Sequence, residues 1–202
     1  MVVGTAAWQW TREQRTRGWN AADVTRCAVV GLILLAVATP LVRRATGAIR
    51  DVSVASHNIY EQQYQMGLFL QEYYQGQAVA ANDIGAINYL AEIRCVDLQG
   101  LNDAAIAGKM MRAQWNTEAI DEVTKERQTR IAIIYEELFV GRIPPDWVKV
   151  AQWQIRNNRV CYSDIVTFYA VERSAKDGLL ADLKAFKSRL PSDVKVRFFV
   201  AK

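Results

Sequence analysis

An uninterrupted apolar run near the start of the chain restricts its fold more than any other feature. The run CAVVGLILLAVATPLV, residues 27–42, contains no charged residue and is followed by two arginines. As an α-helix its about 16 residues span ~24 Å, and a start at Val24 extends it to about 19 residues, close to the ~20 that a bilayer core requires. Arg26 would then reach the lipid headgroups along its own side chain. We expect one transmembrane helix over 24–44.

Two other structures compete with a membrane span. A cleaved signal peptide fits poorly, because about 26 residues precede the run and Arg43 and Arg44 follow it where small residues should lead to a cleavage site. A buried core helix usually keeps one polar face, whereas this run offers only Thr39. Pro40 is expected to kink the last turn, which a membrane helix tolerates. The preferred division is an N-terminal tail over 1–23, the helix, and a domain over 45–202.

Composition excludes several classes of function. Hydrophobic residues make up 51% of the chain, so it can build a folded core. Lys and Arg number 25 against 21 Asp and Glu, a net charge of +4 that is too small to indicate a nucleic-acid partner. The three cysteines form no CxxC pair and there is one histidine, which argues against His/Cys zinc sites and Ser/His/Asp triads. We predict no metal and no cofactor. Cys95 and Cys161 are expected to be buried, inert thiols, although a bridge between them stays open.

Short apolar runs predict the strands of the domain. These are 77–82, 93–98, 131–135, 160–162 and 166–171, with an alternating edge strand over 194–200. Helical patterns lie between them, over about 83–90, 102–111, part of 115–130 and 174–190, and Trp147 to Val150 is expected in a short helix or loop after the Pro-Pro pair. Because strands alternate with helices, we expect a mostly parallel, three-layer α/β domain.

Local signals predict where the helices begin. Asn58 with Glu61, and Ser174 with Asp177, resemble capping boxes; Asp83 is expected as an N-cap, and either Asn102 or Asp103 is expected to begin the helix that runs through Met111. In the helix after Asn58, an exposed face is expected to carry four polar side chains, namely Gln62, Gln65, Gln71 and Glu72.

The strongest candidate for chemistry is Asn82-Asp83-Ile84-Gly85. A carboxylate at the carboxyl end of a strand is where α/β folds place ligands, and the glycine would admit a ligand or a neighbouring strand. Asp97 ends the next predicted strand, just before Gly100, so parallel pairing would bring Asp83 and Asp97 to one sheet edge for acid/base work or cation binding. The alternative is that both aspartates only cap helices or turns. Tyrosines 60, 64, 73 and 74 form either a sugar-stacking surface or a buried helix face.

Three stretches together resemble a known family. They are Asn58–Tyr64 (NIYEQQY), Val79–Ala86 (VAANDIGA) and Val96–Leu101 (VDLQGL). The resemblance is to the C-terminal extracytoplasmic domain of bacterial polytopic glycosyltransferases of the GT-C type, similar to protein mannosyltransferases and lipid A aminoarabinose transferases. There, a last membrane helix leads into a helix, a strand ending in a DIG-like turn and a second strand ending in D-x-x-G-L. The order matches from about Val24 to Leu101.

The resemblance implies sugar transfer from a polyprenyl-phosphate donor at a membrane of the cell envelope, with 45–202 outside the cytoplasm. It also implies that the catalytic acids, which lie in the first extracytoplasmic loop of a many-helix bundle, have no counterpart here. Asp83 and Asp97 match motif positions that we assign to structure or to the acceptor side.

We therefore expect a truncated or accessory module that positions a glycan or lipid-linked acceptor beside membrane lipid. The partner expected for it, besides lipid and glycan, is a polytopic membrane protein. The module itself is not expected to break a glycosyl bond. The ligand-binding candidates are Asn82, Asp83, Gly85, Asp97, Gly100 and Tyr60, with no catalytic residue. The alternative is a signal-anchored enzyme that uses the Asp83/Asp97 carboxylate pair.

Overall fold

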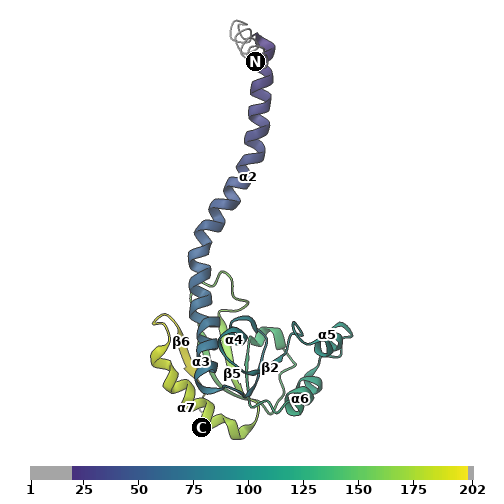
Figure 1. The fold of residues 1–202 in the computed structure, drawn as a ribbon, viewed down its shortest axis with the longest axis vertical. Helices are drawn as coiled ribbons and strands as arrows, with labels where there is room; N and C mark the ends of the chain where they lie inside the picture. The colour runs from purple at the N-terminus through teal and green to yellow at the C-terminus, as the bar shows by residue number, and fades with distance from the viewer. Residues whose placement is uncertain (1–19, 200–202) are drawn as a thin grey trace, which may run out of the picture. The chain divides into compact units, whose positions relative to one another are not determined.

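The computed structural model describes residues 20–199, and the chain divides into two compact units, Met1–Arg50 and Asp51–Lys202. In the described part of the first unit the chain is helical throughout. Helix α2 spans Ala21–Ile59 and is drawn in purple to blue in Figure 1. It begins at Asn20, whose side-chain oxygen accepts a hydrogen bond from the Asp23 amide at 2.9 Å, a standard N-cap. Most of the predicted tail over 1–23 falls outside the described residues.

The apolar part of α2 is not enclosed by protein. Of its most apolar 18-residue window, 0% is buried, so the alternative of a core helix does not describe this segment. Thr39, the one polar side chain of the run, donates to the Leu35 carbonyl at 2.7 Å, and the helix continues through Pro40. The hydroxyl is thereby satisfied within the helix, as a lipid environment requires. This helix is long and apolar enough to cross a membrane.

The second unit contains a six-stranded mixed sheet in the order β2-β1-β3-β5-β4-β6 (Figure 1). The strands are β1 (Ala78–Ala81), β2 (Arg94–Asp97), β3 (Ile131–Ile134), β4 (Val148–Gln154), β5 (Ile165–Ala170) and β6 (Lys195–Phe198). The helical segments are η1 (Tyr60–Tyr64), α3 (Gln65–Tyr73), α4 (Gly85–Leu90), α5 (Ala104–Met111), α6 (Thr117–Glu126), η2 (Glu136–Phe139), η3 (Arg173–Ala175), α7 (Lys176–Phe186) and η4 (Lys187–Arg189).

The α/β class with one apolar N-terminal helix is confirmed, but the sheet is not mostly parallel as expected. Strand β1 pairs in parallel with β2 and β3, but β5 pairs antiparallel with β3 and with β4, and β4 pairs antiparallel with β6. The cause is β4, which the sequence pattern assigned to a short helix or loop. A β-bulge between Lys149 and Ala151 buries Val150 and Ala151 in succession, which breaks the alternation expected of a strand. β4 and β5 then form a hairpin inside the sheet.

Each face of the sheet carries its own hydrophobic cluster. Alternate residues of β1 point to opposite sides, so that Val79 joins a cluster with Phe69 of α3 and Leu183 of α7, while Ala80 joins another with Ile120 of α6. Helices thus pack on both faces. On α7 the buried side chains are Leu179, Leu183 and Phe186, which lie at helical spacing on one face.

Some of the other local predictions are confirmed and others are wrong. The strands β1, β2, β3, β5 and β6 are confirmed, and β6 is an edge strand. Of the two expected starts for α5, Asn102 and Asp103, the structure has Asp103 as the N-cap. No helix begins at Asn58, because α2 runs through it. Asp83 and Ser174 supply no side-chain cap to α4 or α7, and 160–162 is not a strand but part of the loop between β4 and β5. The last predicted strand residue, 200, lies outside the described residues.

Candidate functional site

The π-helical turn η1 brings the polar side chains of the site into the protein. It interrupts the passage from α2 to α3 and buries three consecutive residues, Glu61, Gln62 and Gln63. π-helical turns are rare and are frequent at functional sites. The exposed face predicted for this helix is therefore wrong at Gln62, and at Gln65, which is also buried.

Gln62 and Gln63 meet Asp83 and Tyr135 in one hydrogen-bond network. The Gln63 amide donates to the Asp83 carboxylate at 3.0 Å and to the Tyr135 hydroxyl at 3.1 Å. The hydroxyl proton of Tyr135 has two acceptors within reach, Gln62 Oε1 at 2.8 Å and Asp83 Oδ2 at 3.1 Å. A hydroxyl carries one proton, so it donates to one of the two at a time. When the hydroxyl donates to Gln62, the Asp83 carboxylate keeps the Gln63 amide as its donor.

The network lies at the carboxyl ends of the parallel strands β1 and β3. Asp83 follows β1, and Tyr135 follows β3, which is paired beside it. Asn82 joins the two strand ends, since its side-chain oxygen accepts from the Tyr135 amide at 2.8 Å. The chain leaves β1 for β2 on one side and returns to β3 on the other, which makes this a topological switch point, the usual ligand position in open α/β sheets. Asp83 is half-buried there.

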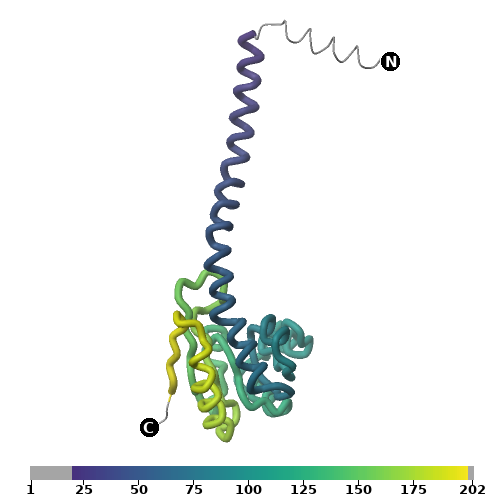
Figure 2. The backbone as a smooth tube through the Cα atoms, turned by 60° about the vertical axis from the view of Figure 1, so that its left-hand side comes forward, coloured from purple at the N-terminus to yellow at the C-terminus, as the bar shows by residue number. Residues whose placement is uncertain are grey.

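The loop between β4 and β5 closes the network from a distant part of the sequence; Figure 2 shows this green loop beside the helix. Cys161 donates from its thiol to Gln63 Oε1 at 3.3 Å, and the Gln62 amide donates to the Ser163 carbonyl at 3.2 Å. Tyr162 stacks on Tyr135 with ring centroids 5.9 Å apart and remains 62% exposed. The loop thus adds an exposed aromatic ring to the site.

Burial fixes the protonation of two groups in the network. It raises the pKa of the Tyr135 hydroxyl, and the nearby Asp83 carboxylate raises it further. Burial also raises the pKa of the Cys161 thiol, against the opposing effect of its hydrogen bond to Gln63. Both groups are therefore neutral hydrogen-bond donors at physiological pH. Cys161 is a buried free thiol, and Cys95, half-buried with a pKa raised by burial to about 11, is also free.

Gly85 begins α4, two residues after Asp83. A Cβ added there would meet no atom of a neighbouring segment within 4 Å. Of the two roles expected for this glycine, close approach to a neighbouring strand is therefore absent from the described chain.

Asp97 and Gly100 form a separate structural turn. β1 and β2 are parallel neighbours as expected, with Ala81 opposite Asp97. However, Asp97 is 0% exposed, and its oxygens accept from the Gln99 and Asn102 amides at 2.9 and 2.7 Å. Gly100 has φ +67°, and a Cβ there would lie 2.6 Å from the Ala107 nitrogen. This arrangement matches the turn-cap alternative and leaves Asp97 without access to a ligand.

The four tyrosines divide between the two alternatives. Tyr60 and Tyr64 are exposed and stacked, with centroids 5.7 Å apart, whereas Tyr74 is buried and donates to Asp182. Tyr73 packs against Phe69 of the core. Tyr60 and Tyr64 thus offer an aromatic surface on the helix, and the other pair belongs to the folded interior.

Sequence reasoning missed most partners of Asp83. Gln62 and Gln63 stood within a motif but were given no role, and Tyr135 was assigned only to a buried strand. A run of polar residues between two apolar helical segments was the available signal. It also missed a group that could hold a metal, formed by His57, Glu61 and Asp193.

A family model described as "Domain of unknown function (DUF8728)" matches residues 57–169, more than half of the chain. The chain belongs to this family. The DUF8728 match includes every side chain of the network around Asp83, whereas α7 and β6 lie beyond its end. No curated protein and no solved structure matches the chain.

Proposed function

We propose that this DUF8728 chain is a membrane-anchored binding module that holds a hydroxyl-rich ligand, a glycan or the head group of a lipid-linked acceptor, at the switch point around Asp83. The observation that carries the proposal is the half-exposed Asp83 carboxylate, which buried Gln63 and Tyr135 hold in place beside the exposed ring of Tyr162. Carboxylates and amides hydrogen-bond to sugar hydroxyls, and an exposed tyrosine offers a flat apolar face with a polar tip.

The membrane part of the proposal rests on α2. Its run of exposed Leu, Ile and Val side chains is far larger than the apolar patches that soluble proteins tolerate. Insertion into a bilayer removes this surface from water. We propose a single-pass anchor with residues 45–202 outside the cytoplasm, in the cell envelope.

The resemblance to the terminal domain of GT-C glycosyltransferases supports the choice of a carbohydrate ligand. Its three motif stretches fall on η1, on the carboxyl end of β1 and on the turn after β2. The first two supply Gln63 and Asp83 to the network. We assign the chain to binding and not to bond cleavage, because Asp97 is engaged in its turn and leaves Asp83 without a second carboxylate partner there.

A binding titration tests the proposal. The full chain is placed in lipid nanodiscs and titrated with synthetic polyprenyl-phosphate glucose, with sugar-free polyprenyl phosphate as the control ligand. We expect saturable binding of the glycosylated lipid, weakened ~10-fold by Asp83→Asn through loss of a charge-assisted hydrogen bond. Asp146→Asn, an exposed aspartate in the loop before β4, is the matched control and should bind as the parent does.

Two outcomes would overturn the proposal. Equal binding of the two lipids would remove the sugar from the recognised ligand. Release or transfer of the glucose by the chain would show that it is an enzyme, and loss of that turnover in Asp83→Asn and Asp97→Asn with folding intact would favour the carboxylate-pair alternative.

A further inference from the structure

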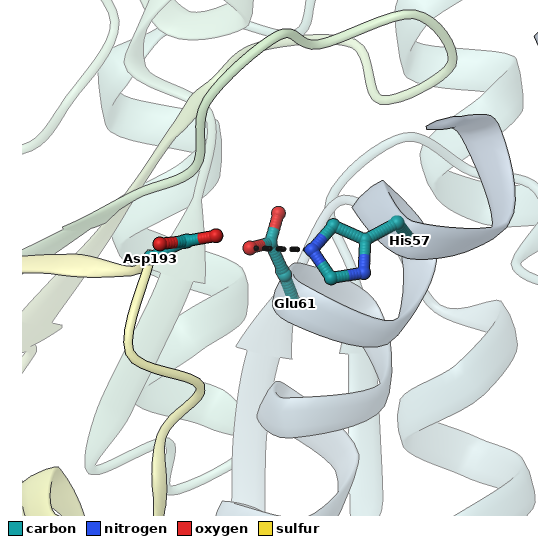
Figure 3. A group of neighbouring side chains, drawn as sticks. All are labelled: His57, Glu61 and Asp193. Atoms are coloured by element: carbon teal, nitrogen blue, oxygen red, sulfur yellow. Dashed lines mark ion pairs between the residues drawn. The ribbon is translucent and has the colours of Figure 1, made fainter. Parts of the chain in front are cut away.

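A second polar group on the same helix lies outside the Asp83 network. His57 near the end of α2, Glu61 in η1 and Asp193 before β6 each offer one ligand atom, and these atoms lie within 4.8 Å of one another (Figure 3). His57 and Glu61 are four residues apart, which places them on one helix face. Asp193 comes from a distant part of the sequence, so the fold brings the group together.

Glu61 is the member that points to a ligand. Its side chain is 1% exposed, and its Oε1 accepts no hydrogen bond within the described chain. His57 Nε2 is 3.1 Å from this oxygen, but the ring N–H is not directed at it, so the contact is an ion-pair distance without a hydrogen bond. Burial of a carboxylate is unfavourable unless it is hydrogen-bonded, paired with a full positive charge or bound to a metal.

The positions of the three groups are compatible with a common ion. Metal–ligand distances of ~2.0–2.2 Å in a tetrahedral site place two donors ~3.3–3.6 Å apart. His57 and Asp193 are exposed, so their side chains can move by the roughly one ångström that coordination requires. Buried Glu61 would be the fixed ligand. The solvent side of the ion would remain open to water, the arrangement of sites with three protein ligands.

We propose that His57, Glu61 and Asp193 bind one divalent transition-metal ion, with Zn²⁺ as the best fit to one imidazole and two carboxylates. The ion compensates the buried Glu61 charge and ties η1 to the turn that precedes edge strand β6. The proposal is independent of the glycan site, since it shares no side chain with the Asp83 network.

The test uses the full chain in detergent micelles without a histidine tag, since His57 is the chain's only histidine. Metal-stripped protein is titrated with Zn²⁺ alone against a chromophoric chelator, and separately with Mn²⁺ and Ca²⁺. We expect one equivalent of Zn²⁺ to bind, with affinity reduced at least ~10-fold by His57→Ala and by Asp193→Asn. Asp177→Asn, an exposed aspartate of α7, should change the affinity less than twofold.

Two further readouts separate a metal site from a structural ion pair. X-ray absorption of the Zn²⁺-loaded chain should show nitrogen and oxygen ligands at ~2.0–2.1 Å and one imidazole, whereas a cysteine ligand would appear at ~2.3 Å. Zn²⁺ should also raise the melting temperature of the parent and not that of His57→Ala. Sulfur ligation, or binding that survives both His57→Ala and Asp193→Asn, would overturn the proposal. So would a chain that binds no Zn²⁺ and is destabilised by His57→Ala, which would leave only an ion pair.

Discussion

The hydroxyl of Tyr135 joins the helix to the sheet, and Tyr135→Phe removes it without changing the buried ring. The hydroxyl donates to Gln62 or Asp83 and accepts from Gln63, so two hydrogen bonds are lost at a time. Each contributes about 1 kcal/mol net, and Gln62 Oε1 is also left buried without its donor, so we expect a loss of about 3 kcal/mol in the free energy of unfolding. For a chain of this length that lowers the melting temperature by ~6–12 °C.

The assay is thermal unfolding of the full chain in micelles, followed by near-ultraviolet circular dichroism. Tyr162→Phe is the matched control, because Tyr162 is 62% exposed and lies at the edge of the network, stacked on the Tyr135 ring. This control should unfold within ~0.5 kcal/mol of the parent. If Tyr135→Phe melts as Tyr162→Phe does, the buried network does not hold η1 against the sheet, and Asp83 is not positioned as described.

Two further predictions concern the backbone and the buried phenols. Gly100→Ala should lose at least ~2 kcal/mol in thermal melts, because its φ of +67° and the Ala107 backbone reject a Cβ, whereas Gly85→Ala should gain ~0.5 kcal/mol or stay neutral; equal melts for the two variants would refute this. Burial raises the pKa of three of the chain's eight tyrosines, Tyr74, Tyr135 and Tyr169, so the stabilisation from their neutral form is complete below the ordinary pKa of 10.0 and is lost as pH rises above it. In an absorbance titration these three phenols should ionise only on unfolding, and ionisation of all eight in the folded chain near pH 10.0 would contradict the prediction.

The sequence was sufficient for features set by local pattern. The apolar run, the strand just before Asn82 and the start of α5 at Asn102 or Asp103 follow from composition, periodicity and capping chemistry within a few residues. The same reasoning found Asp83, because a carboxylate after a buried strand has a known meaning in α/β folds.

Features that depend on residues distant in the sequence could not be predicted from local pattern. The β4 pattern is broken by a bulge, and its antiparallel pairing depends on where β5 inserts. Gln62 and Gln63 look like exposed residues until the π-helical turn and the loop carrying Cys161 bury them. Asp97 and Asp83 follow neighbouring parallel strands as expected. Whether each carboxylate stays accessible depends on its backbone and side-chain hydrogen-bond partners, which the local pattern does not show.

We propose above that the apolar stretch of α2 lies in lipid and anchors the domain. A fluorophore on Leu34→Cys, with the native cysteines replaced by serine or alanine, would report this in liposomes, with Val52→Cys as the control on the same helix. We predict that lipids brominated deep in their acyl chains quench the Leu34 label and that aqueous iodide does not, while iodide quenches the label at position 52. Quenching of the Leu34 label by iodide, with no effect of brominated lipid, would contradict the account.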